Sequence, residues 1–141
     1  MKQAPVFSLY DLYEGQEVTS EQYKGIPLML TFWTSWCPDS QRDLQKKEIL
    51  YSKLDDQTLA MLNINVIGRE RKPRAGQDYV NAHQLLIPMV EDQGTDTYER
   101  FRCQGVPTTV LITADGEIAQ QFGDKTTFEE IMKHVAPLLQ S

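Results

Sequence analysis

The chain has few cysteines: its 141 residues contain only Cys37 and Cys103, which lie far apart in the sequence. Two scattered cysteines argue against a disulfide-stapled secreted mini-domain, and nothing has the spacing of a zinc cluster. We therefore expect neither a metal nor another cofactor. With 40% hydrophobic residues the chain can bury a core without such cross-links, and its length is ordinary for one domain over residues 1–141.

Long hydrophobic runs are also absent. The longest, Ile26 to Trp33, is far too short to span a bilayer, so we expect no membrane insertion. The N-terminal residues show no basic start followed by an apolar segment, so no signal peptide is visible. The compartment stays open: cytoplasmic if the chain is full length, and extracytoplasmic if a signal or anchor has been removed.

Positive charge is scarce, since the formal net charge is −6 and the basic residues are scattered. Binding to nucleic acid or to an anionic membrane is therefore not expected, and we expect a monomer. One basic cluster consists of Arg69, Arg71, Lys72 and Arg74, interrupted by Glu70 and Pro73. We interpret it as a solvated loop after a strand, with docking of a partner as the alternative.

The hydrophobic pattern predicts an α/β chain with a mixed central sheet. The expected strands are 6–9, a short ribbon at 18–19, 28–33, 59–67, 87–90, 106–113 and 118–122. The expected helices are a brief turn at 20–23, then 38–54, 77–86, 95–101 and a last one from about 126 or 127. Asp115-Gly116 suits a type I′ turn between the last two strands. This order implies a sandwich with helices on both faces of the sheet.

The helix expected at 38–54 has an inner and an outer face. The inner stripe at near-helical spacing is Leu44, Lys47, Leu50, Tyr51 and Leu54. The residues expected to face solvent are Gln41, Arg42 and Asp43. The helix is therefore expected to pack one side on the sheet.

The run Phe32-Trp33-Thr34-Ser35-Trp36-Cys37-Pro38-Asp39-Ser40 joins a buried strand to this helix. The N-terminus of a helix stabilises an anion, and the thiolate is the nucleophilic form of cysteine. Cys37 is therefore expected to be a reactive nucleophile, although Asp39 places an opposing charge nearby. Pro38 fits the first turn, where its missing N–H has no helical partner. Trp36 is expected either to pack or to contact a docked peptide at the rim of the site.

Ser40 lies one helical turn beyond Cys37, on the same face. Its hydroxyl can hydrogen-bond the thiolate, but it cannot attack a mixed disulfide as the second cysteine of a C-x-x-C enzyme does. Release of a bound partner must then come from an external thiol or from Cys103, or it does not occur. An engineered replacement of cysteine by serine would look the same. Cys103 reads as a small buried hydrophobe, and a resolving role requires its α-carbon within about 7 Å of that of Cys37.

Four motifs occur in a fixed order along nearly the whole chain. They are Pro5-x-Phe7-x-Leu9, Phe32-Trp33-x-Ser35-Trp36-Cys37-Pro38, Gly105-Val106-Pro107-Thr108-Thr109 and Ile112-x-x-Asp115-Gly116. In this combination the chain resembles the bacterial TlpA/ResA-like thiol–disulfide oxidoreductases, which are close to the AhpC/TSA redoxins. The resemblance implies a thioredoxin-like three-layer sandwich. It also implies partners that are thiols or disulfides, either proteins or low-molecular-weight compounds.

The resemblance changes the interpretation of Pro107. From spacing alone it would read as an ordinary trans turn, whereas the resemblance implies a cis proline beside the active cysteine. It also implies that the backbone of Val106 pairs with the substrate peptide. We therefore assign Cys37 and Ser40 to catalysis, and Trp36, Pro38, Val106 and Pro107 to substrate binding.

The sequence departs from the family pattern where the chemistry lies. The family carries C-x-x-C, whereas this chain has Cys37-Pro38-Asp39-Ser40. The family also carries a buried acidic residue after the strand that follows the active-site helix. Glu70 lies nearby, but its neighbours Arg69 and Arg71 lead us to expect it to be exposed, without a role in proton transfer.

Three functions remain open. The leading one is a thiol–disulfide oxidoreductase-like monothiol, in which Cys37 forms mixed disulfides that an external thiol releases. The second is a one-cysteine peroxidase, because Thr34 precedes Cys37 by the spacing of the peroxiredoxin motif. Leu30 and Pro107, however, stand where those enzymes carry the motif's proline and an arginine. The third is a redox-inactive binding module that keeps the groove beside Pro107.

Overall fold

Eight strands form one mixed sheet in the computed structural model, which describes residues 2–11, 13 and 15–139. Their order across the sheet is β1-β8-β7-β4-β5-β6-β2-β3. They span Lys2–Gln3 (β1), Ser8–Asp11 (β2), Gln16–Thr19 (β3), Leu28–Trp33 (β4), Ala60–Asn65 (β5), Met89–Glu91 (β6), Thr108–Ile112 (β7) and Glu117–Phe122 (β8). Strand β4 pairs in parallel with β5 and antiparallel with β7, which confirms the expected mixed sheet.

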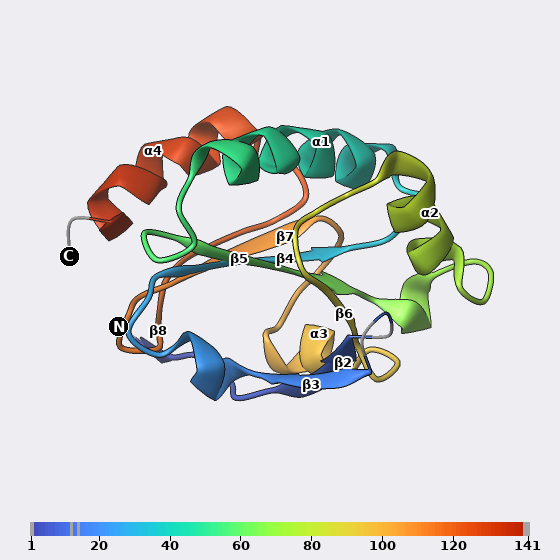
Figure 1. The fold of residues 1–141 in the computed structure, drawn as a ribbon, viewed down its shortest axis with the longest axis horizontal. Helices are drawn as coiled ribbons and strands as arrows, with labels where there is room; N and C mark the ends of the chain where they lie inside the picture. The colour runs from blue at the N-terminus through green and yellow to red at the C-terminus, as the bar shows by residue number, and fades with distance from the viewer. Residues whose placement is uncertain (1, 12, 14, 140–141) are drawn as a thin grey trace.

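Helices cover both sides of this sheet. They span Pro38–Lys53 (α1), Ala75–His83 (α2), Asp96–Arg100 (α3) and Phe128–Leu139 (α4), with short 3₁₀ turns at Ser20–Tyr23 (η1) and Ile67–Arg69 (η2). Figure 1 shows α1, α2 and α4 above the central strands, and α3 with the β2–β3 ribbon below them. The thioredoxin-like three-layer sandwich is therefore confirmed. None of the helices in the described ranges is long and apolar enough to cross a bilayer.

Strand β4 is the centre of the core, and all six of its residues are buried. Alternate side chains of a strand point to opposite faces, so β4 contributes to two apolar layers. Leu30 and Phe32 join the cluster that contains Tyr98 on α3, whereas Met29 packs with Ile131 on α4. Because β4 is fixed on both faces, the loop that follows it has a fixed starting point.

The hairpin between β7 and β8 differs from the expected type I′ turn. That turn requires positive φ at both central residues, but only Gly116 has it, with φ +89°, and Asp115 does not. The Gly116 N–H instead donates to the Thr113 carbonyl at 2.9 Å, so the turn starts earlier and Gly116 follows it in the left-handed region. The antiparallel pairing of the two strands is as predicted.

Candidate active site

Cys37 caps the N-terminus of α1, as the sequence predicts. Its backbone is extended, with φ −85° and ψ 118°, and Pro38 opens the first turn. The Cys37 carbonyl accepts the first helical hydrogen bond, from the Gln41 N–H at 3.0 Å. The side chain is only 8% exposed. The nucleophile candidate therefore lies at the end of β4, just beneath the surface.

The loop that contains Pro107 faces this cysteine. The Val106–Pro107 peptide bond is cis, as the resemblance implied. Cys37 Sγ lies 3.5 Å from the Val106 carbonyl oxygen, so the thiol can donate a hydrogen bond to it. The two motifs meet because β4 and β7 are neighbours, with Phe32 opposite Thr108. The pairing of these strands thus places Cys37, the candidate nucleophile, beside Val106 and Pro107, which were assigned to substrate binding.

Ser40 is fully buried in the first turn of α1. Its Oγ lies 3.5 Å from the Thr34 N–H, which donates to it. Within the described residues Ser40 has no hydrogen bond to Cys37, so the expected bond to the thiolate stays a prediction. The buried position nevertheless holds the hydroxyl where a C-x-x-C motif would hold its second thiol.

Cys103 is a second free thiol, half-buried against the same core. It packs on the cluster that includes Cys37, Phe32 and Val106. Burial raises the pKa of the Cys103 thiol to about 12, and a hydrogen bond with Thr108 opposes this only partly. A protonated thiol is a poor attacking group.

In the part of the chain that is described, no group of three or more His, Cys, Asp or Glu side chains is placed to hold a metal ion.

Glu70 is not exposed as expected, but half-buried against the active-site loop. Its carboxylate accepts hydrogen bonds from the Ser35 N–H, the Ser35 hydroxyl and the Asn65 side-chain amide, each at 2.7 Å. The expectation was wrong because the chain after η2 turns back onto the loop before Cys37. One sequence signal could have shown this: Asn65 ends a buried strand, where its amide needs a partner.

Trp36 attaches the basic cluster to the site. Its Nε1 donates to the Arg69 carbonyl oxygen at 2.8 Å, and the Arg71 guanidinium lies 4.0 Å from the centroid of its ring. The basic side chains are exposed, as expected for a loop. The loop is nevertheless fixed to the residue that precedes Cys37.

Lys47 forms a buried ion pair within α1 and connects this helix to the sheet by hydrogen bonds. Lys47 is fully buried, and its Nζ lies 2.7 Å from Asp43 Oδ2 while donating to Thr31 Oγ1 at 2.8 Å and to Thr109 Oγ1 at 2.6 Å. Burial lowers the pKa of Lys47, and the Asp43 carboxylate opposes this. The expectation that Asp43 faces solvent was wrong, because Lys47 occupies the inner face of α1 and draws the carboxylate inward.

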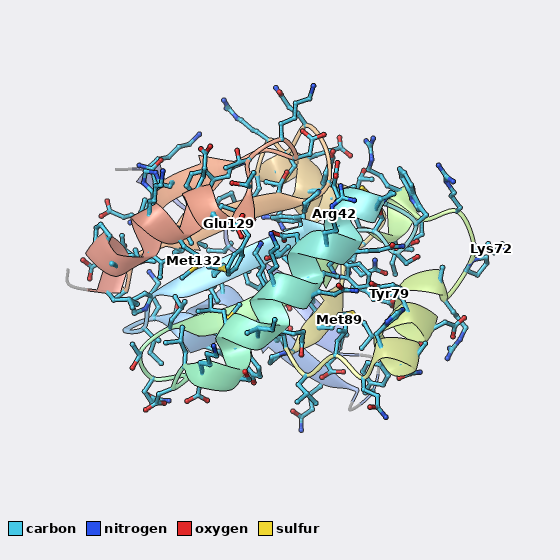
Figure 2. All side chains as sticks on the ribbon, turned by 90° about the horizontal axis from the view of Figure 1, so that it is seen from above. Arg42, Lys72, Tyr79, Met89, Glu129 and Met132 are labelled. Carbon is cyan, nitrogen blue, oxygen red and sulfur yellow. The ribbon has the colours of Figure 1, made fainter. Side chains whose placement is uncertain are left out.

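An open cavity of about 270 Å³ lies beside Pro107, between the starts of α1 and α4. Charged side chains line it, including Arg42, Asp43 and Glu129. Figure 2 shows Arg42 on α1 and Glu129 on the neighbouring α4. The cavity leaves space next to Pro107.

A cysteine that caps a helix after a central buried strand, and that faces a cis proline, defines the class of thioredoxin-fold thiol–disulfide oxidoreductases. The AhpC/TSA family model matches residues 1–121, and the chain belongs to this family. Ser40 stands where a C-x-x-C motif has its second cysteine.

Known proteins of this class resemble the chain along almost its whole length. It is 30% identical over 139 residues to the thiol-disulfide oxidoreductase ResA of Halalkalibacterium halodurans, covering 96% of this chain and 77% of that protein. It is 25% identical over 127 residues to the sporulation thiol-disulfide oxidoreductase A of Bacillus subtilis, covering 90% and 76%. The thioredoxin domain of a Bacteroides vulgatus thiol-disulfide oxidoreductase superposes with a TM-score of 0.82 at 17% identity, covering 98% and 96%. The first two support a thiol–disulfide oxidoreductase-like function, and the third shows the fold.

Proposed function

We propose that the chain acts as a monothiol in thiol–disulfide exchange with protein partners. The Cys37 thiolate attacks one sulfur of a partner disulfide. One S–S bond forms as the other breaks, and the second partner sulfur leaves as a thiolate that takes up a proton. An external thiol then attacks the partner's sulfur in the mixed disulfide and returns Cys37 to its thiol form.

The observation that carries this proposal is the arrangement of three groups. The Cys37 sulfur faces the Val106 carbonyl oxygen beside Pro107, so a partner bound along this loop lies next to the nucleophile. Ser40 fills the position one turn along α1 with a buried hydroxyl, which cannot displace the partner. Cys37 can therefore form an adduct at this site but has no thiol on the same helical face to release it.

Cys103 is not expected to take over this task. Its raised pKa, about 12, keeps it protonated at neutral pH, and attack requires the thiolate. This supports release by an external thiol rather than by an internal one.

The peroxidase alternative has less support from the site. The Thr34 side chain, which would contact peroxide, is fully buried. Its hydroxyl has no hydrogen-bond partner among the described residues, and as a buried group it is not accessible to a peroxide in this structure. Pro107 also occupies the face where a peroxide-polarising arginine would be needed.

Trapping experiments test the monothiol proposal. The protein is incubated with a disulfide-bonded peptide, and the mixed disulfide is followed by intact mass with and without added glutathione. We expect a Cys37 adduct that persists until glutathione is added, no adduct in Cys37→Ser, and unchanged behaviour in Cys103→Ser. Spontaneous loss of the adduct that disappears in Cys103→Ser would show that Cys103 resolves it, and the monothiol mechanism would then be wrong.

A further inference from the structure

We propose that a basic rim beside Cys37 docks an acidic segment of the protein partner, next to the disulfide that Cys37 attacks. The rim consists of Trp36, Arg69, Arg71 and Lys72. This inference rests on the proposed exchange function and adds the chemistry of the partner.

The rim is held at the nucleophile by two contacts. The Trp36 indole donates to the Arg69 carbonyl oxygen at 2.8 Å, and the Arg71 guanidinium lies over the same ring. Trp36 directly precedes Cys37 in the chain. The basic loop is therefore fixed to the residue that directly precedes Cys37.

Among the residues that the structure describes, these cations have no acidic partner. In the described part of the chain, the ion pairs are Arg42–Asp39, Lys46–Glu129, Lys47–Asp43 and Arg100–Asp96. None of them includes Arg69, Arg71 or Lys72. The Arg69 guanidinium instead lies 5.2 Å from the centroid of the Tyr98 ring. Carboxylates of a partner can pair with these groups without breaking any ion pair between described residues.

The acidic residues near the rim are already engaged. Glu70 directs its carboxylate to three donors on Ser35 and Asn65, and Asp39 pairs with Arg42. Neutral donors do not cancel the charge of the Glu70 carboxylate, but Arg69, Arg71 and Lys72 outnumber it, so the rim has an excess of positive charge in a chain whose formal net charge is −6. An acidic partner is repelled by the molecule as a whole and attracted here, so the charge pattern orients its approach.

The rim combines apolar surface with positive charge. Trp36 is 36% exposed and Ile67 is 40% exposed, so apolar surface alternates with the cations. Trp and Arg are the residues most often found at the centre of protein interfaces. Figure 2 shows Lys72 at the outer edge of the molecule, so the positive charge extends from the site to the periphery. This extent suits several residues of a chain better than one small thiol.

Exchange rates with three matched peptides test the inference. Each peptide carries one cysteine as a mixed disulfide with the same aromatic thiol, flanked by glutamates, glutamines or lysines, and release of the aromatic thiol is timed at low salt. We expect the glutamate peptide to react about tenfold faster than the lysine peptide. The difference should vanish near 1 M salt, where the Debye length is about 3 Å.

Charge-reversal variants locate the effect. Lys72→Glu and Arg71→Glu should each reduce the preference for the glutamate peptide, and Lys72→Glu does so without touching the Trp36 contact. Lys133→Glu on α4 makes the same change in net charge at an exposed position away from the site, and it should leave the preference unchanged. Equal rates for all three peptides, or an equal effect of Lys133→Glu, would overturn the inference.

A binding arm separates this inference from the exchange function. Peptides with serine in place of cysteine are titrated into the protein, and tryptophan fluorescence is recorded. Tighter binding of the glutamate peptide, weakened by Lys72→Glu, supports the rim even if Cys37 fails to exchange. Rapid exchange with no charge preference in either arm would leave the proposed function standing and reject the acidic partner.

Discussion

The carboxylate of Glu70 receives two hydrogen bonds from Ser35, one from its main-chain N–H and one from its hydroxyl, each at 2.7 Å. Ser35 lies in the loop between β4 and the start of α1. The same carboxylate accepts a third bond from Asn65, the last residue of β5. Glu70 therefore fixes the active-site loop to the neighbouring parallel strand, and its role is in positioning the loop.

Removing this carboxylate should loosen the active-site loop. We expect Glu70→Ala to lower the free energy of unfolding by about 1–3 kcal/mol, because donors of Ser35 and Asn65 lose their acceptor. Urea denaturation measures the loss. The alkylation rate of Cys37 in the folded protein should change as well, since the loop positions Trp36 and Cys37. Glu130→Ala, at an exposed position on α4, should have little effect on either quantity.

The buried ion pair gives a sharper stability test. Lys47→Met leaves the Asp43 carboxylate buried without its cation, and we expect a loss of about 3–5 kcal/mol. In the double variant Lys47→Met/Asp43→Leu, Thr31 and Thr109 remain directly opposite each other and can pair. Most of the stability should therefore return. A double variant as unstable as Lys47→Met alone would show that the lysine supports the helix through more than its pairing with Asp43.

Ser40→Cys should convert the monothiol into a dithiol protein. A thiol one turn from Cys37 attacks the mixed disulfide intramolecularly, so we expect release of the partner about 100-fold faster without added thiol. The loss of the isolated mixed disulfide in thiol-free buffer, followed by intact mass, measures the gain. Ser52→Cys makes the same chemical change at the far end of α1 and should leave release dependent on an external thiol. Equal release in both variants would contradict the geometric argument.

The reactivity of Cys103 should depend on pH in a defined direction. In Cys37→Ser, iodoacetamide should modify Cys103 very slowly at pH 8 in the folded protein and rapidly in urea, because burial raises its pKa to about 12.

The same raised pKa makes the free energy of unfolding depend on pH. The contribution of the protonated Cys103 thiol to this free energy is complete below pH 9. Between pH 9 and 12 the unfolded chain loses this proton first, so stability falls as the pH rises through that window.

A comparison variant isolates that contribution from other groups that titrate in alkali. Urea unfolding of Cys37→Ser is measured across this range beside Cys37→Ser/Cys103→Ala. As the pH rises from 9 to 12, the free energy of unfolding of Cys37→Ser should fall relative to that of Cys37→Ser/Cys103→Ala. A difference that stays constant between pH 9 and 12 would mean that Cys103 titrates alike in the folded and unfolded chain.

The sequence by itself determined the order of the main strands and helices and the place of the candidate nucleophile, but it did not predict β1 or the turn η2. Residues 28–33 form a nearly continuous apolar run, which is a local feature of the sequence. The strand was therefore predicted with its observed bounds, Leu28–Trp33. The start of the helix is also a local feature, because Pro38 and the polar residues next to it favour a first helical turn. The adjacent sequence alone therefore predicted Cys37 as the capping residue. The resemblance to a known family added the cis state of Pro107.

Only the tertiary structure decided which groups surround the cysteine. Glu70 and Asp43 were both expected in solvent, and both turned inward. Glu70 meets Ser35 of the active-site loop, whereas Asp43 pairs with Lys47 of its own helix, which Thr31 and Thr109 of the sheet hold in the core. The same holds for Arg71, whose contact with Trp36 turned a charged loop into a rim of the site. Hydrophobic periodicity records which side of an element is buried. It carries no information on the distant polar group that satisfies a buried charge, because that pairing depends on how the elements pack.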